Sequence, residues 1–277
     1  MTSKRLFLRA MIAGLFCVVV FASCHHSGSS DGGSPVNNSY LALASTVSQG
    51  SMINDSFSYD DQHRIARFVQ YATDGTHSGV ITIDFTFSGG NALPAGYTYT
   101  MNTDAPKSHV LAYDGQGRII KDTSLSGDHF VTYYTYSGNY IINTILFDGT
   151  YNDAQIDSLK VTDGNITGTK VWGADQGTWE KQGDVTLAHV TAANPGYKEP
   201  VANAIGPLLY VLSVYNYGGY NDFISKALTN KISGEADGLP PGGFNYSVSV
   251  DASARVSSMS LTGVGVPAGS KTVFTYY

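Results

Sequence analysis

The sequence predicts a mainly β fold: an antiparallel up-and-down meander curled into a closed or nearly closed barrel, with a short helical insert near residues 200–233. Three observations predict it. From Tyr40 onward apolar and polar residues alternate, turn-forming residues separate the runs, and one turn pattern occurs three times. The composition agrees, because 31 Gly and 9 Pro in 277 residues disfavour long helices. We therefore expect residues 39–277 to form a single barrel-like domain that contains an insert at 199–243.

Residues 1–23 predict a lipoprotein signal peptide. Basic residues precede an apolar run over 11–21, which is too short for a membrane-spanning helix. Small residues then precede Cys24, and this arrangement resembles the lipobox of bacterial lipoproteins, which implies that the Cys24 thiol is lipidated and the chain is cut just before it. His25 stands where an aspartate would favour inner-membrane retention, so the resemblance implies the outer membrane. An unmodified Cys24 after an ordinary cleavage site is the alternative.

Residues 24–38 are rich in Ser and Gly and predict a flexible tether. His25 and His26 on such a linker form only a weak chelate, so we expect a spacer and no metal site. The formal net charge of −6 excludes non-specific nucleic-acid binding, which needs a basic surface.

The clearest strand signal lies at 80–87. Ile81, Ile83, Phe85 and Phe87 share one face, and polar residues alternate with them on the other. Similar β-branched or aromatic runs occur at 97–101, 108–113, 129–136, 140–147, 156–162, 166–172, 244–250 and 271–277. We expect each run to be a strand with one buried face.

The repeated turn pattern runs from an aspartate through three residues to an arginine. Its copies are Asp60–Arg64, Asp114–Arg118 and Asp251–Arg255. The aspartate is expected to accept backbone N–H bonds two residues on, and the arginine to return beside it. The third turn residue is His63, Gly117 or Ala254 in the three copies, and it is expected to adopt a positive φ. A ligand-binding row of Asp/Arg pairs is the alternative.

The segment 199–233 departs from the alternation. Ala202, Ile205, Leu208, Leu209 and Leu212 are spaced as on a helix, although Pro207 is expected to kink or shorten it. A second helical turn is predicted over 223–228. We expect the insert to pack its apolar face on the sheet as a lid or plug. A membrane-contact helix is the alternative, but the basic face of such helices is missing.

The lipobox, the repeated hairpin turns and the closing strand 271–277 together resemble a family of bacterial lipoproteins of unknown function described as having a porin-like fold. The resemblance spans roughly residues 50–277, with Ser225 and Lys226 in the place of that family's Ser-Lys segment. The residues at 252–254 depart from its usual turn. The resemblance implies a curved antiparallel barrel and no particular activity. Since many strands look short and rich in Thr and Ser, we expect a soluble, tethered barrel rather than an integral one.

The candidate ligand platform is aromatic. With a turn near 174–177, Trp172 and Trp179 are expected to lie directly opposite each other on one face of a hairpin. The sequence favours an aromatic pair that covers the end of the barrel core, and the alternative is a flat platform that stacks on a sugar ring. The remaining platform residues are Asp175, Gln176, Tyr215, Tyr217 and Tyr220.

No catalytic motif is found, and neither a metal nor a cofactor is expected. His77, His109, His129 and His189 are scattered and are expected to be hydrogen-bonded structural residues. We therefore expect a non-enzymatic outer-membrane lipoprotein, lipid-anchored on the periplasmic or surface face, that binds a glycan or small hydrophobic ligand. The alternatives are an envelope scaffold that pairs strand edges with a protein partner, and a hydrolase, which would require two carboxylates or a His–carboxylate pair in a pocket.

Overall fold

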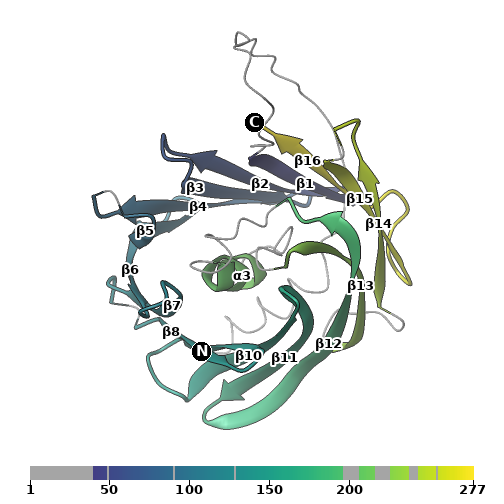
Figure 1. The fold of residues 1–277 in the computed structure, drawn as a ribbon. Coiled ribbons are helices and arrows are strands. Elements are labelled where there is room, and N and C mark those ends of the chain that lie inside the picture. The colour runs from purple at the N-terminus through teal and green to yellow at the C-terminus, as the bar shows by residue number, and fades with distance from the viewer. Residues whose placement is uncertain are drawn as a thin grey trace.

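The computed structural model describes residues 40–48, 50–89, 91–127, 129–195, 206–215, 225–236, 243–253 and 255–277. In this part of the chain sixteen antiparallel strands form a closed barrel, in which each strand pairs with its neighbours in sequence and β1 pairs with β16 (Figure 1). The predicted fold class is therefore confirmed. The sheet closes between β1 and β16, whereas β13 and β14 pair only through Lys231–Asn245 and Ile232–Phe244, so the edge-pairing alternative stays a prediction.

The first eight strands are β1 Leu41–Ser48, β2 Ser51–Tyr59, β3 Ile65–Thr73, β4 Ser78–Phe87, β5 Pro94–Met101, β6 Lys107–Tyr113, β7 Ile119–Ser124 and β8 Val131–Ser137. The other eight are β9 Tyr140–Leu146, β10 Asp153–Thr162, β11 Asn165–Asp175, β12 Thr178–Ala193, β13 Ala227–Ala236, β14 Phe244–Val250, β15 Val256–Gly263 and β16 Lys271–Tyr276. The helix α3, Gly206–Tyr215, lies between β12 and β13 in the chain.

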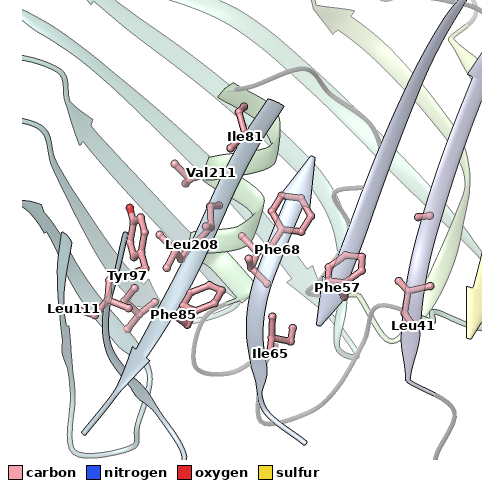
Figure 2. Packing of buried hydrophobic residues seen from close by; sticks show 14 of the residues in the cluster. Leu41, Phe57, Ile65, Phe68, Ile81, Phe85, Tyr97, Leu111, Leu208 and Val211 are labelled. Carbon is pink, nitrogen blue, oxygen red and sulfur yellow. The ribbon is translucent and has the colours of Figure 1, made fainter. Parts of the chain in front are cut away.

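The inner face of the barrel is apolar and packed. Ile81, Ile83 and Phe85 are buried as the alternation predicts, together with Phe57 and Phe68 from β2 and β3. Helix α3 lies inside the ring of strands, and its buried side chains Leu208, Leu209 and Val211 join the same core (Figures 1 and 2). The expectation of a plug that packs against the sheet is thus confirmed for this helix.

The outer face carries charged side chains. Arg67 on β3 pairs with Asp84 on β4, and Asp184 on β12 pairs with Lys170 and Lys181. Further charged residues at outward positions of the register are Lys121, Lys160, Lys231, Glu235 and Lys271. An apolar interior with a charged exterior is the reverse of a porin, whose lipid-facing band is apolar and whose lumen is polar.

The two ends of the barrel differ in what they carry. Because the strands alternate in direction, the turns after even-numbered strands and both chain ends share one end, which we name the entry rim. There the N–H of Tyr277 donates to the carbonyl of Tyr40 at 3.0 Å, and the Tyr40 ring stacks on His63 with centroids 5.0 Å apart. The turns after odd-numbered strands form the opposite end, the far rim.

The three repeated turns have the predicted chemistry and all lie at the entry rim. The first-turn carboxylates, on Asp60, Asp114 and Asp251, accept the N–H two residues on and bond the arginine side chain four residues on. His63 and Gly117 adopt φ of 59° and 76°, while Ala254 lies outside the described residues. Each arginine also stacks over an aromatic ring of the next strand: Phe87, Tyr136 or Tyr276. These stacks join each hairpin to the strand that follows it.

The predicted insert needs correction. The helical turn expected over 223–228 is wrong, because Ala227 begins β13 and pairs with β12. Pro207 lies in the first turn of α3, where its missing N–H has no helical partner to lose, so it starts the helix instead of kinking it. Ala202 and Ile205 lie outside the described residues. Among the described helical residues, none forms a helix long and apolar enough to cross a membrane.

Many strands are short, as expected. β6, β7 and β16, for example, span 7, 6 and 6 residues, fewer than the ~9–11 residues of a membrane barrel strand. β10, β11 and β12 are the longer exceptions, with 10, 11 and 16 residues.

Candidate functional site

The hairpin of β11 and β12 carries both tryptophans and turns at the far rim. Gln176 and Gly177 adopt φ of 50° and 80°, as a two-residue hairpin turn requires. Two turn residues let the strands run on to the Asp175–Thr178 pair, so Ala174 faces Trp179 and Trp172 faces Lys181. The expectation that the two tryptophans are directly opposite is therefore wrong. They lie diagonally, on the same face.

That face is the outer one. Trp172 has the same orientation as Lys170, which pairs with Asp184 on the outer surface, whereas Thr169 and Gly173 at alternate positions face inward and are buried. Trp172 and Trp179 keep 40% and 37% of their surface exposed. The expectation that they cover the end of the core is accordingly wrong.

The tryptophans belong to a larger surface, which we name the outer apolar patch. Cross-strand pairing places two rows side by side on β8–β12: Tyr133, Thr144, Ile156 and Trp172 in one, and Val131, Leu146, Ala154, Ala174 and Trp179 in the other. Leu146, Ala154 and Ala174 are buried and form a small cluster of their own on this outer side. The patch brings both tryptophans together with a buried apolar cluster, whereas exposed apolar residues such as Val110, Ile120 and Tyr140 lie on the outer wall outside it.

Polar groups border the outer apolar patch. Asp175 and Gln176 are exposed at the turn. On one side the Nζ of Lys121 lies 5.3 Å from the Tyr133 ring centroid, and on another Lys181 donates to Asp184 at 2.8 Å. The hydrogen bond from Lys181 lowers the pKa of Asp184, so this carboxylate is charged at neutral pH. Flat aromatic rings with donors and acceptors at their edge suit a sugar ring, which has apolar faces and a hydroxylated rim.

The other predicted platform residues are not brought to this patch. Tyr215 ends α3, whose backbone lies inside the barrel, on the other side of the wall. Tyr217, Tyr220 and Cys24, the predicted lipidation site, lie outside the described residues. Of the predicted platform, the structure therefore assembles Trp172, Trp179, Asp175 and Gln176.

A buried polar cluster inside the barrel was not singled out from the sequence. The hydroxyl of Tyr97 donates to Oδ2 of Asp122 at 2.6 Å, and His109 Nδ1 lies 2.9 Å from Oδ1 of Asp122. The Tyr97 and His109 rings stack with centroids 4.4 Å apart. Burial, helped by the charge of Asp122, raises the pKa of Tyr97 well above its usual value. The sequence signal that could have indicated this cluster is the strand alternation, which places His109 on the same face as Leu111.

The cluster bears on the hydrolase alternative. His109 is hydrogen-bonded, as expected of a structural histidine, and its partners are Asp122 and Tyr97. Within the described residues the hydroxyl that is hydrogen-bonded to His109 is that of Tyr97, while Ser124 is its cross-strand neighbour and no serine, threonine or cysteine is hydrogen-bonded to it. The geometry is that of a buried link between β5, β6 and β7.

Comparison with known proteins bears on the fold. No protein-family model and no curated protein matches the chain. Among solved structures, the chain is similar to the crystal structure of a porin-like protein from Bacteroides uniformis ATCC 8492, with 12% identity and a TM-score of 0.55. The match covers 85% of this chain and 96% of that one. At this identity the likeness concerns the fold alone, and it agrees with the closed barrel: the chain has a porin-like β-barrel fold.

Proposed function

We propose that the chain is a non-enzymatic lipoprotein, anchored to the outer membrane through Cys24, whose barrel stands in water and binds a glycan on the outer apolar patch. The observation that carries the proposal is the pair of half-exposed tryptophans on one face of a hairpin, with charged and polar groups at their border. The lipobox-like sequence before Cys24 supports the anchor, and a porin-like fold is compatible with a place in the envelope.

The outer face supports a barrel surrounded by water. A lysine or arginine on the lipid face of a membrane barrel costs about 2–4 kcal/mol at the bilayer midplane. This barrel has Arg67 and Asp84 within β3 and β4, and Lys170, Lys181 and Asp184 on β11 and β12. The packed core around α3 fills the space that an aqueous channel would occupy in a porin. A tethered binding domain accounts for both features.

The position of the outer apolar patch supports binding of a ligand that approaches from outside. The patch reaches the far rim, whereas the chain enters the barrel at Tyr40 on the entry rim. A tether at the entry rim holds the far rim away from the membrane. Stacking of a sugar on Trp172 or Trp179 buries apolar area, and the polar border supplies hydrogen bonds to hydroxyl groups.

Glycan-array screening and calorimetry on the full-length protein in mild detergent test this proposal. Trp172→Ala and Trp179→Ala should each weaken binding of an array hit by about tenfold or more. The matched control is Tyr140→Ala, because Tyr140 is an outward aromatic with 40% exposure near the entry rim, outside the patch. Identical profiles for the wild type and both tryptophan variants would end the platform proposal, and selective binding of hydrophobic small molecules would change its ligand class.

An envelope scaffold is the second candidate, and the outer apolar patch is the observation that favours it. Because the barrel closes, most strand edges are already paired with a neighbour, and the patch face is the docking surface that we assign to a protein partner. Pull-down from intact envelopes separates the two functions: a stable protein partner lost in Trp172→Ala, with no glycan signal, would favour the scaffold.

A further inference from the structure

The inner wall formed by β8, β9 and β10 carries a group of buried polar side chains next to the apolar core. Its residues are Thr132, Tyr134, Asn143, Gln155 and Asp157, all buried, and we name them the inner polar wall. Tyr134 pairs with Asn143 and Asn143 pairs with Asp157 across neighbouring strands, so these three side chains form a row. Thr132 precedes Tyr134 by two residues and shares its face.

Most of this wall lacks hydrogen-bond partners. Both polar atoms of the Asn143 amide are buried and unpartnered, as are Oδ2 of Asp157 and the hydroxyls of Thr132 and Tyr134. The single bond made within the wall joins Nε2 of Gln155 to Oδ1 of Asp157 at 2.6 Å. The hydroxyls of Thr132 and Tyr134 lie near each other, but without hydrogen-bond geometry.

Other polar pairs of the barrel interior are hydrogen-bonded. On β5–β7, Asp122 receives bonds from Tyr97 and His109, and on β2 and β3 the side chain of Gln70 donates to Asp55 at 2.7 Å. Among the described residues, three buried side-chain atoms outside the inner polar wall also lack a partner, one each on Asn54, Tyr136 and Asn230, whereas the wall has five together. Buried polar groups in native proteins nearly always have partners, so a local group of five requires an explanation.

Helix α3 covers this side of the interior. It approaches β7 and β9, and its buried side chains Leu208, Leu209 and Val211 are apolar, so they cannot bond Asn143 or Asp157. Figure 2 shows Leu208 and Val211 beside Phe68, Ile81 and Tyr97. An apolar helix against a polar wall stabilises neither surface. The polar wall therefore offers donors and acceptors that a hydroxylated ligand between it and α3 could bond.

We propose that the inner polar wall is a binding site for a small, uncharged, polyhydroxylated molecule of monosaccharide size, and that α3 covers the site when it is empty. A hydroxyl group both donates and accepts, as does the Asn143 amide. The wall contains no cationic side chain to hold an anion. Tyr134, Asn143 and Asp157 on three adjacent strands span about 10 Å, which suits one sugar ring.

The proton equilibrium of Asp157 supports this ligand class. Burial raises the pKa of Asp157 to about 7. The groups beside it are Gln155, Asn143 and Val171, none of which titrates. A protonated carboxyl donates one hydrogen bond and accepts another, so it recognises a hydroxyl without fixing a charge inside the barrel.

Calorimetry and native mass spectrometry of the full-length protein with free glucose, galactose and N-acetylglucosamine test the proposal. The wild type should bind one molecule of at least one of these sugars. Asn143→Leu should weaken that binding at least tenfold while the melting temperature stays equal or rises, because two unpartnered buried atoms are removed. Tyr134→Phe removes one hydroxyl at nearly constant shape and should weaken binding several-fold, again without loss of melting temperature.

Two controls separate this site from other effects. Gln70→Leu breaks a satisfied buried pair and should lower the melting temperature without changing sugar affinity. Trp172→Ala should leave the interior site unaffected, which separates it from the outer apolar patch. The proposal is overturned if no sugar binds the wild type at millimolar concentration, if Asn143→Leu binds as the wild type does, or if Asn143→Leu loses as much melting temperature as Gln70→Leu.

Discussion

Inside this barrel, single polar side chains have very different surroundings although they occupy equivalent inward positions. Asp122 accepts two hydrogen bonds, whereas Asp157 accepts one and leaves its second oxygen unpartnered. A buried carboxylate is stabilised by donors and destabilised by loss of water. The same substitution at Asp122 and at Asp157 should therefore change the free energy of unfolding by different amounts or in opposite directions.

Asp157 should make stability depend on pH. Burial raises its pKa from 3.8 to about 7, so the native state favours the protonated acid. Its contribution is fully present below pH 4 and is lost as pH rises through 7. Asp157→Asn has the shape of the protonated acid but does not titrate. In urea unfolding, the wild type should lose on the order of 4 kcal/mol relative to this variant between pH 4 and pH 8; a difference that does not change with pH would contradict the raised pKa.

Two tyrosine-to-phenylalanine substitutions form a matched pair. Both hydroxyls are buried, but that of Tyr97 donates to Asp122 while that of Tyr134 has no partner. Tyr97→Phe should cost about 1–3 kcal/mol of unfolding free energy, because a buried carboxylate loses a donor. Tyr134→Phe should cost nothing measurable by the same urea titration. Equal losses in the two variants would show that the Tyr134 hydroxyl is satisfied in solution.

At the scale of elements, hairpin turns set the register of this barrel. The Asp–Arg turns each fix one hairpin at the entry rim and connect it to the next strand through an arginine–aromatic stack. The Gln176–Gly177 turn uses two positive-φ residues and thereby decides which residue faces each tryptophan. A turn one or two residues longer would place a different pair of side chains opposite each other.

The tryptophan hairpin gives a prediction at this scale. Gln176 has φ of 50°, which asparagine tolerates better than glutamine, so Gln176→Asn should raise the melting temperature slightly. Gly177 has φ of 80°, so Gly177→Ala should lower stability by about 1–2 kcal/mol. Thermal unfolding followed by circular dichroism measures both. If Gly177→Ala is neutral, the turn is not of the two-residue type and the tryptophan register changes with it.

Elements with a strong local signal were predictable from the sequence, and those set by tertiary contacts were not. The Asp60–Arg64 and Asp114–Arg118 turns follow from side-chain chemistry within five residues. β13 was hidden because its start depends on distant partners: the hydroxyl of Ser225 accepts the N–H of Ile166, and the N–H of Ala227 donates to Asn165. The polar cluster of Tyr97, His109 and Asp122 joins three strands, and the spacing of these residues along the chain does not predict that contact.

For the whole molecule, the distribution of polarity matters more than the strand count. Sixteen strands with an apolar outer band would make a porin, whereas here the apolar residues surround α3 and the charges face outward. The porin-like likeness describes the path of the chain. The distribution of polarity supports our proposal that the barrel stands in water.

The solubility of the protein with and without its lipid anchor tests whether the barrel stands in water. A version in which an ordinary secretory signal replaces residues 1–24 should be released from the membrane fraction and stay monodisperse without detergent. The native protein should partition with the outer membrane and carry a lipid mass on Cys24. Size-exclusion chromatography measures the dispersity of the released chain, and intact mass spectrometry measures the lipid mass on Cys24. A released chain that needs detergent, or a Cys24 without lipid, would contradict the proposed anchoring.

The hydrogen bond between Tyr277 and Tyr40 has a practical consequence. Since the first and last residues of the barrel touch, a short peptide could join them, and new termini could be cut at the turn between β3 and β4. Such a circular permutant would keep every strand neighbour but emerge from the opposite end. Reattached to its lipid anchor, it would present the molecule upside down, with the tryptophans against the bilayer and the arginine turns toward the surroundings.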